Sequence, residues 1–374
     1  MIYLDNSATT RVCGEAAEKA LYMMRECFGN PSSLHSMGFE AEKELERARE
    51  AVAQRLFCKS GEITFTSGGT ESNNLAVMGA ALARKRLGNK VVTTALEHPS
   101  VMESMKELEK QGFEVVYLKP DALGEITPES VAQAVDSNTV LVSMMSVNNE
   151  TGLVLPLQAV KTAIRKSGAP ALFHVDNVQG FGKIPLNVSK LGIDLMSVSG
   201  HKIHAPKGVG ALYVKEKTRL IPRALGGGQE KNLRSGTEGV PGICAMGAAV
   251  RALGDEEENL EKVGALRDLL CAELEKIGSV TLNSPRNALP YIVNFSCGKV
   301  RGETMLHFLE SKGIYVSTGS ACSKAKPSSV LTALGLTRER ISSSIRVSFS
   351  KYSTADEVTA LAAALAQGME CIAH

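Results

Sequence analysis

Seven short apolar segments alternate with helical segments between Glu62 and Val214, and this alternation constrains the fold more than any other feature of the chain. The predicted strands cover residues 63–66, 90–95, 114–118, 140–145, 171–175, 194–198 and 210–214. The predicted helices between them cover residues 71–87, 99–111, 128–135 and 157–166. Strands that are separated by helices indicate a mostly parallel sheet covered on both faces. We therefore expect a large α/β domain over residues 15–255.

The pattern changes in the last third of the chain. A long helical stretch is predicted over residues 240–277, and its acidic run at 255–258 marks a bend. Strands at 291–296, 314–316 and 345–348 then alternate with helices at 302–311 and 354–371. These elements, with residues 1–14, predict a smaller α+β domain made of residues 1–14 and 256–374.

Composition excludes several classes of function. The net charge of +2 gives no reason to expect a nucleic-acid partner. No stretch has enough consecutive apolar residues to span a bilayer. The eight cysteines are scattered without a Cys-x-x-Cys pair, so they predict neither a zinc site nor a disulfide scaffold. Without the features of a signal peptide at its start, the chain is expected in the cytoplasm, away from membranes.

Lys202 follows the predicted strand 194–198 in the run Ser199-Gly200-His201-Lys202. Open α/β sheets bind ligands at the carboxyl ends of their strands, so this amine is placed for chemistry. Taken alone, Lys202 is more readily interpreted as a solvated cation, because most lysines are exposed, and the motifs below reverse this interpretation.

A glycine-rich turn joins the first predicted strand to a helix, in Ser67-Gly68-Gly69-Thr70-Glu71. Such a turn brings backbone N–H groups and the positive end of the helix dipole to an anion, which suits one phosphate group. The alternative is a tight turn with Thr70 as a helix cap. The lysine of a nucleotide-binding P-loop is missing.

Asp176 ends the apolar strand 171–175, where its carboxylate is expected to be partly buried and to need a partner. It either pairs with Lys202 or binds a cationic ring nitrogen. His98 and Asn149 follow other strands at the same predicted edge, although a histidine at a helix start is often structural. A phosphate cradle, a buried carboxylate, a lysine and a ring for stacking together describe a pyridoxal phosphate site.

At these residues the sequence resembles the cysteine desulfurases of the NifS/IscS type, in the class V aminotransferase group of fold-type I pyridoxal phosphate enzymes. The resemblance runs along almost the whole chain. Its landmarks are Tyr3-Leu4-Asp5-Asn6-Ser7-Ala8-Thr9-Thr10, Gly29-Asn30-Pro31-Ser32-Ser33, the run at 67–74, Glu97-His98, Val147-Asn148-Asn149-Glu150, His174-Val175-Asp176, Ser199-Gly200-His201-Lys202, Arg234-Ser235-Gly236-Thr237, Gly319-Ser320-Ala321-Cys322 and Ile345-Arg346-Val347-Ser348.

The resemblance implies a role for each matching residue. Lys202 would hold pyridoxal 5′-phosphate as a Schiff base, Asp176 would bind its ring nitrogen, and His98 would stack on the ring and transfer protons. Gln179 and Asn149 would contact the cofactor near the ring hydroxyl, and Asn149 would also contact the substrate. Arg346 would bind the substrate carboxylate. The phosphate group would lie among Gly69, Thr70, Ser199, His201 and a Thr237 from the second subunit of a homodimer.

Cys322 lies in a run of small residues that suits a mobile, exposed loop. By resemblance it is the thiolate that takes sulfur from L-cysteine, which leaves a persulfide on Cys322 and L-alanine as product. The persulfide would pass to a sulfur-acceptor protein, either an iron–sulfur scaffold or a tRNA-thiolation enzyme.

Two departures from the family pattern stand out. His204 and Ala205 replace a Tyr-Gly pair after Lys202, and the stretch from Cys322 to Val330 is about two residues shorter, which leaves the acceptor open. The alternatives are a selenocysteine lyase, a cysteine sulfinate desulfinase or, in another class, a non-catalytic sulfur-trafficking adaptor.

Overall fold

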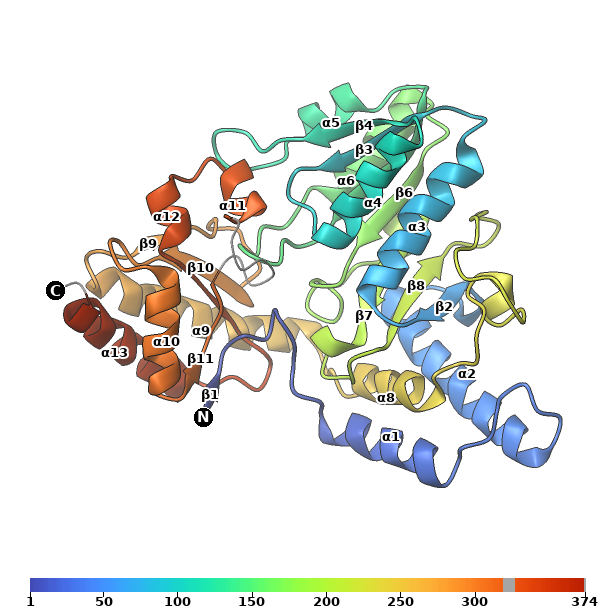
Figure 1. Ribbon diagram of the computed structural model, residues 1–374, viewed down its shortest axis with the longest axis horizontal. Helices are drawn as coiled ribbons and strands as arrows, with labels where there is room; N and C mark the ends of the chain where they lie inside the picture. Colours follow the sequence, from blue (N-terminus) through green and yellow to red (C-terminus); the bar gives the residue numbers. More distant parts are fainter. Residues whose placement is uncertain (319–326, 373–374) are drawn as a thin grey trace.

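A seven-stranded sheet forms the centre of the computed structural model, which describes residues 1–318 and 327–372 (Figure 1). In spatial order its strands are β2 (Ile63–Thr66), β8 (Gly210–Val214), β7 (Leu195–Ser199), β6 (Leu172–Asp176), β5 (Thr139–Met145), β3 (Lys90–Thr94) and β4 (Glu114–Leu118). All neighbouring pairs are parallel except those of β8, which is antiparallel to both β2 and β7. The predicted mostly parallel α/β sheet is therefore confirmed, with each strand within one residue of its predicted bounds.

Helices bury both faces of this sheet. On one face, Leu141, Leu172 and Leu195 pack beneath α3 (Gly69–Arg84) and α4 (Pro99–Lys110). On the other face, Val142 and Phe173 join a core to which several helices contribute residues. Among these helices are α2 (Ser36–Leu56), α5 (Pro128–Ala134), α6 (Leu157–Ser167) and α8 (Val240–Arg251). Successive residues of a strand point to opposite faces of the sheet. A sheet that helices cover on both faces therefore has apolar residues on both faces.

The helix α2 begins at Ser36. His35 caps it, because its Nδ1 accepts a hydrogen bond from the backbone N–H of Gly38 at 3.3 Å. α1 (Gly14–Arg25) packs with α2 against α8 at one end of the molecule (Figure 1). A histidine cap lies outside the usual Ser, Thr, Asp and Asn set, so the sequence pattern did not reveal it.

The long helical stretch predicted over 240–277 is two helices, α8 and α9 (Glu256–Lys276). Gly254 adopts a positive φ of 78°, and the side chain of Asp255 accepts hydrogen bonds from the N–H groups of Glu257 and Glu258. The acidic run therefore begins a new helix at the bend that the sequence predicted.

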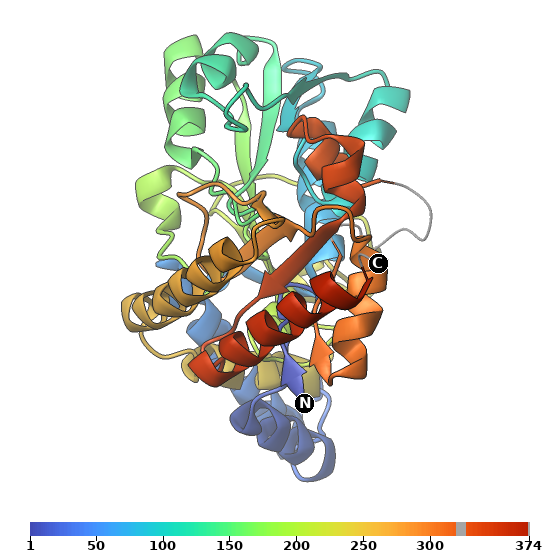
Figure 2. The same cartoon turned by 90° about the vertical axis from the view of Figure 1, so that its left-hand side faces the viewer.

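The last third of the chain forms a separate core. Phe295, Leu270 and Leu365 lie at its centre, and α9 packs against α13 (Ala355–Ile372) (Figure 2). The antiparallel strands are β9 (Thr281–Leu282), β10 (Ile292–Ser296) and β12 (Ser344–Ser348). The helices are α10 (Gly302–Ser311), α11 (Ser329–Ala333) and α12 (Arg338–Ser342). The domain boundaries at residues 14 and 255 stay a prediction.

Residues 2–10 link this core to the large sheet. The strand β1 (Ile2–Tyr3) pairs in parallel with β11 (Ile314–Tyr315), and the backbone N–H of Thr10 donates to the carbonyl of His201 at 2.8 Å. The remaining short helices are η1 (Ser60–Glu62), α7 (Val188–Leu191), η2 (Gly200–Lys202) and η3 (Glu230–Asn232). Within the described ranges, no helix is long and apolar enough to cross a membrane.

Candidate active site

Polar side chains gather where the parallel strands β3, β5, β6 and β7 end. Asp176 is the last residue of β6, Ser199 is the last of β7, and Lys202 ends the short helix η2 that follows. His98 follows β3 and caps α4. The structure therefore places these predicted site residues at one edge of one sheet, as the parallel order requires.

Asp176 is buried and held from two sides. Its Oδ2 accepts a hydrogen bond from Asn73 Nδ2 at 2.7 Å, and its Oδ1 accepts one from the N–H of Val178 at 3.0 Å. Burial raises the pKa of this carboxyl, while the hydrogen bonds and the nearby His98 and Lys202 charges act in the opposite direction. A cationic ring nitrogen at this carboxylate would stabilise its charge further.

His98 has a defined orientation and tautomer. Its Nδ1 accepts a hydrogen bond from the N–H of Ser100 at 3.2 Å and lies 2.8 Å from the Ser100 hydroxyl. Because a backbone N–H can only donate, the proton of the neutral ring is assigned to Nε2. Burial lowers the pKa of His98, so the ring is expected to be neutral at neutral pH.

One amide connects these two residues. Asn73 Nδ2, which binds Asp176, also donates to the Ser100 hydroxyl at 2.9 Å. Neither Asn73 nor Ser100 was predicted as a site residue. Asn73 lies one helical turn after Gly69, a spacing that would have put it on the same face of α3 as the start of the helix.

The amine of Lys202 lies against residues 7 and 8. It donates hydrogen bonds to the carbonyl oxygens of Ser7 and Ala8, the latter at 2.8 Å. Neither carbonyl carries a full charge, so the amine can exchange these contacts for a covalent partner. The polar turn that begins the chain is therefore part of this site.

The predicted phosphate cradle is a hollow of about 370 Å³ at the start of α3. It is lined by Ala8, Thr9, Ser67, Gly68, Gly69, Thr70, Glu71, Ser199, His201, Lys207 and Gly208. Gly68 has a φ of 150°, and a Cβ on Gly69 would lie 2.7 Å from Cγ2 of Val178. Glycine therefore suits both positions, which lie at the N-terminus of a sixteen-residue helix, where an anion would be stabilised.

The positive charge in this hollow comes from Lys207, which was not predicted as a site residue. Burial, together with the Lys202 and Lys207 charges, lowers the pKa of His201 to about 4, so His201 is neutral at pH 7. Lys207 therefore supplies the positive charge there, and His201 contributes hydrogen bonds. Thr237 lines a neighbouring hollow instead.

Arg346 lies on β12 and faces the same edge. Its Nη2 is 2.8 Å from Oδ1 of Asp5, and its Nη1 donates to the carbonyl of Asn149 at 3.0 Å. Its Nε is buried and has no hydrogen-bond partner among the described residues. A guanidinium has five N–H donors, and the two hydrogen bonds above use only two of them, so Arg346 can donate to a further carboxylate.

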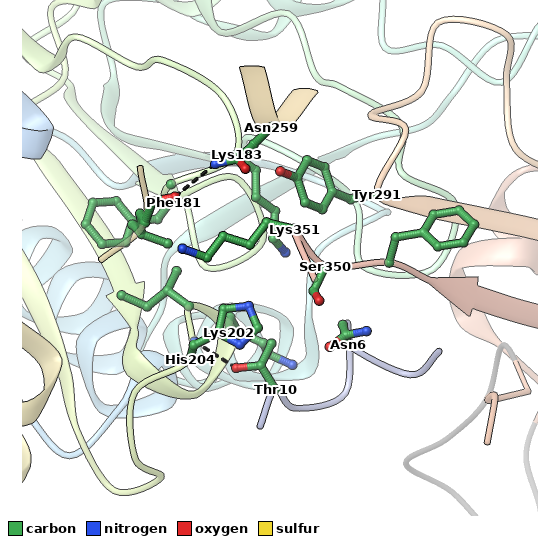
Figure 3. Close-up of a pocket in the computed structure, with 14 residues that line it drawn as sticks. Asn6, Thr10, Phe181, Lys183, Lys202, His204, Asn259, Tyr291, Ser350 and Lys351 are labelled. Carbon is green, nitrogen blue, oxygen red and sulfur yellow. Dashed lines mark hydrogen bonds between the residues drawn. The ribbon is translucent and has the colours of Figure 1, made fainter. Parts of the chain in front are cut away.

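Two other predicted residues lie close by. Gln179 is buried, and its Nε2 donates to the carbonyl of Ser7 at 3.0 Å, beside the amine of Lys202. Asn149 is half-buried next to Arg346. His204, one of the departures from the family pattern, packs edge-on against Tyr352 and its Nδ1 lies 2.9 Å from the carbonyl of Arg11. Figure 3 shows His204 beside Lys202.

Cys322 lies outside the described residues. The seven cysteines that the structure describes are Cys13, Cys27, Cys58, Cys244, Cys271, Cys297 and Cys371. Burial raises the pKa of Cys58, Cys244 and Cys297 to about 12, which keeps these thiols protonated at neutral pH. They are thus unsuited to act as nucleophiles.

These residues fit pyridoxal 5′-phosphate. The glycine cradle matches a phosphate, Asp176 matches a ring nitrogen, and Lys202 matches an aldehyde. The fit rests on the chemistry of this donor set and on the glycines Gly68 and Gly69 in the hollow.

Comparisons with known proteins agree with this geometry. The sequence pattern of the family described as aminotransferase class-V matches residues 2–361. The chain is 43% identical to "Cysteine desulfurase IscS" of Dictyoglomus turgidum, over 96% of this chain and 91% of that protein. It is 42% identical to the protein of the same name from Methanosarcina thermophila, over 96% and 89%.

Solved structures give the same result. A structure described as a NifS-like protein has a TM-score of 0.93 and 38% identity, with 99% of each chain covered. A structure of SspA in complex with cysteine has a TM-score of 0.83 and 34% identity, and covers 95% of this chain and 100% of its own. Both the family resemblance and the fold class predicted from the sequence are confirmed.

Proposed function

This chain belongs to the aminotransferase class-V family and is a cysteine desulfurase, and we propose that Lys202 holds pyridoxal 5′-phosphate for this reaction. The observation that carries the proposal is the arrangement of Asp176, His98 and Lys202 at one sheet edge, beside the glycine cradle. The overall reaction converts L-cysteine and the thiol of Cys322 into L-alanine and a Cys322 persulfide. The S–H and Cα–H protons are redistributed, and no external oxidant is required.

When bound, pyridoxal phosphate supplies a ring that withdraws electrons from the substrate amino acid. Asp176 would keep a proton on the ring nitrogen, because a buried carboxylate stabilises a neighbouring cation. The Lys202 nitrogen would accept and return the proton of the substrate Cα, with the neutral His98 as the second group that moves protons. Thr70, Ser199, His201 and Lys207 would hold the phosphate, with Thr237 of a second copy in a homodimer.

The substrate is held by its carboxylate. Arg346 would bind it through its guanidinium, whose Nε has no partner in the described part of the chain. Asp5 and the carbonyl of Asn149 fix the other side of the guanidinium and so orient it. Cys322 would then attack the substrate sulfur, and the carbon–sulfur bond would break.

The sulfur acceptor is proposed as a protein that accepts a persulfide, in iron–sulfur cluster assembly or tRNA thiolation. The homodimer and the cytoplasmic location stay predictions from the sequence.

Reconstitution tests this function. Purified protein incubated with pyridoxal phosphate is expected to become yellow and to release alanine from L-cysteine. The amount of alanine is expected to equal the amount of sulfur delivered to a thiol acceptor. Absorbance spectroscopy and amino-acid analysis measure the two. Protein that stays colourless and inactive would favour the non-catalytic adaptor instead.

Replacement of Arg346 by lysine is expected to raise KM for cysteine by about 10–100-fold with a smaller change in kcat. A lysine keeps the positive charge but lacks the planar set of N–H donors with which a guanidinium binds both oxygens of a carboxylate. A hydrogen bond to a charged group contributes about 1.5–3 kcal/mol. Steady-state kinetics check this, with the exposed Arg338→Lys variant as the matched control. Equal KM values in the two variants would remove Arg346 from the substrate site.

A further inference from the structure

A small cavity of about 20 Å³ adjoins Lys202 on the side of the last third of the chain (Figure 3). It has room for about one water molecule. The described residues that line it include three lysines, Lys183, Lys202 and Lys351, and neither an aspartate nor a glutamate. Buried ammonium groups normally have an anionic partner, and none of the described residues that line this cavity supplies one to Lys183.

Lys183 is the most deeply buried of the three, with 7% of its surface exposed. Its Nζ lies 3.4 Å from Oε1 of Gln179 and 5.5 Å from the ring centre of Tyr291. Neither group carries a full negative charge. Burial, and then the charges of Lys202 and Arg346, lower the pKa of Lys183 to about 7.

The influence of two neighbouring amines is mutual. If the charge of Lys202 makes Lys183 harder to protonate, the charge of Lys183 makes the Lys202 nitrogen harder to protonate as well. A neighbouring cation is one of the known ways in which proteins activate a lysine amine. The mechanism above requires the Lys202 nitrogen to accept a proton and release it again, so its proton affinity matters.

The other charged or titratable groups near this pair come from several elements. They are Asp5 beside β1, His98 at α4, Asp176 on β6, His201 and His204 around η2, and Arg346 and Lys351 on and after β12. Asp5 already pairs with Arg346, and Asp176 faces the proposed ring nitrogen. Burial lowers the pKa of each of the three histidines, so they add no charge at neutral pH. Lys183 is thus the buried lysine that shares this cavity with Lys202.

We propose that Lys183 is a positioning residue that weakens proton binding at the nitrogen of Lys202, and so sets the pH range in which that nitrogen is a proton acceptor. This inference rests on the proposed function, because it concerns Lys202 when it carries the cofactor. It assigns a role to a residue that touches neither the substrate nor the sulfur.

The test is a pH titration of the absorbance of the cofactor-bound enzyme without substrate, which reports protonation of the Lys202 nitrogen independently of turnover. Lys183→Met keeps the apolar stem and removes the charge, and it is expected to raise the titration midpoint by about one to three pH units. Lys183→Arg keeps a permanent positive charge, so its midpoint is expected at or below that of the unmodified enzyme.

Two further variants serve as controls. Lys166→Met removes an exposed charge from α6 and is expected to leave the midpoint unchanged. Lys351→Met changes a less buried amine at the same cavity, and a smaller rise than in Lys183→Met is expected. Thermal unfolding of each variant shows whether it is folded.

Folded Lys183→Met enzyme with an unchanged midpoint would overturn the proposal, and so would a midpoint in Lys183→Arg that rises as far as in Lys183→Met. These outcomes leave the proposed function intact. Failure of that function gives a different result, because the unmodified enzyme would then show no pH-dependent cofactor band to titrate.

Discussion

Replacement of Lys202 by alanine is expected to abolish covalent binding of pyridoxal phosphate and to lower the rate of alanine release from cysteine by about 10³–10⁴-fold. Two functions are lost together, the amine that anchors the cofactor and the group that moves the substrate proton, and proton transfer alone contributes about 10²–10⁴-fold. Borohydride reduction followed by peptide mapping checks the first loss, and a kinetic assay checks the second.

Lys207→Ala is the matched control for this experiment. Lys207 lines the hollow proposed for the phosphate group, and its proposed role is to supply positive charge there. The variant is expected to bind the cofactor more weakly and still to carry the reduced label on Lys202. A label on another lysine, or none in the unmodified enzyme, would contradict the proposed site.

Replacement of Cys322 by alanine is expected to reduce alanine release from cysteine to the level of a blank, while the yellow absorbance of the bound cofactor remains. The carbon–sulfur bond breaks only if a nucleophile takes the sulfur, and the cysteines with pKa values raised to about 12 cannot replace this thiolate. Mass spectrometry of the unmodified enzyme after one turnover should find the additional sulfur atom on the peptide that contains Cys322.

Cys371→Ala removes an exposed thiol at the end of α13. It controls for any effect of removing a cysteine that has no catalytic role. It is expected to retain full activity. Undiminished activity in Cys322→Ala would instead favour the selenocysteine lyase or cysteine sulfinate desulfinase alternatives, which share the cofactor site without needing this residue.

The sequence predicted those site residues that stand close after a recognisable strand in the same short segment of chain. Asp176 and Lys202 each follow an apolar strand directly, so the parallel order of the sheet alone brings them to one edge. His98 was found in the same way. The strands were located because four to seven apolar residues between polar turns have few other interpretations.

The parts that were missed depend on contacts between distant segments. Asn73 reaches Asp176 across 103 residues of sequence, and Arg346 meets Asp5 across 341. Lys183 is a cation in an otherwise apolar stretch, and only the structure shows that it lies beside Lys202 in one cavity. Local patterns contain no information about such pairings.

The contacts of residues 2–10 have a consequence for how the enzyme is made. Ile2 pairs with Ile314, and the backbone N–H of Ser7 donates a hydrogen bond to Oγ of Ser348. The carbonyl oxygen of Ser7 accepts a hydrogen bond from the Lys202 amine. On the ribosome, the earliest residues must therefore wait until more than 300 others have been translated before they find their neighbours. Loading with the vitamin-derived cofactor is thus expected to follow the end of synthesis, because contacts of such long sequence separation form late.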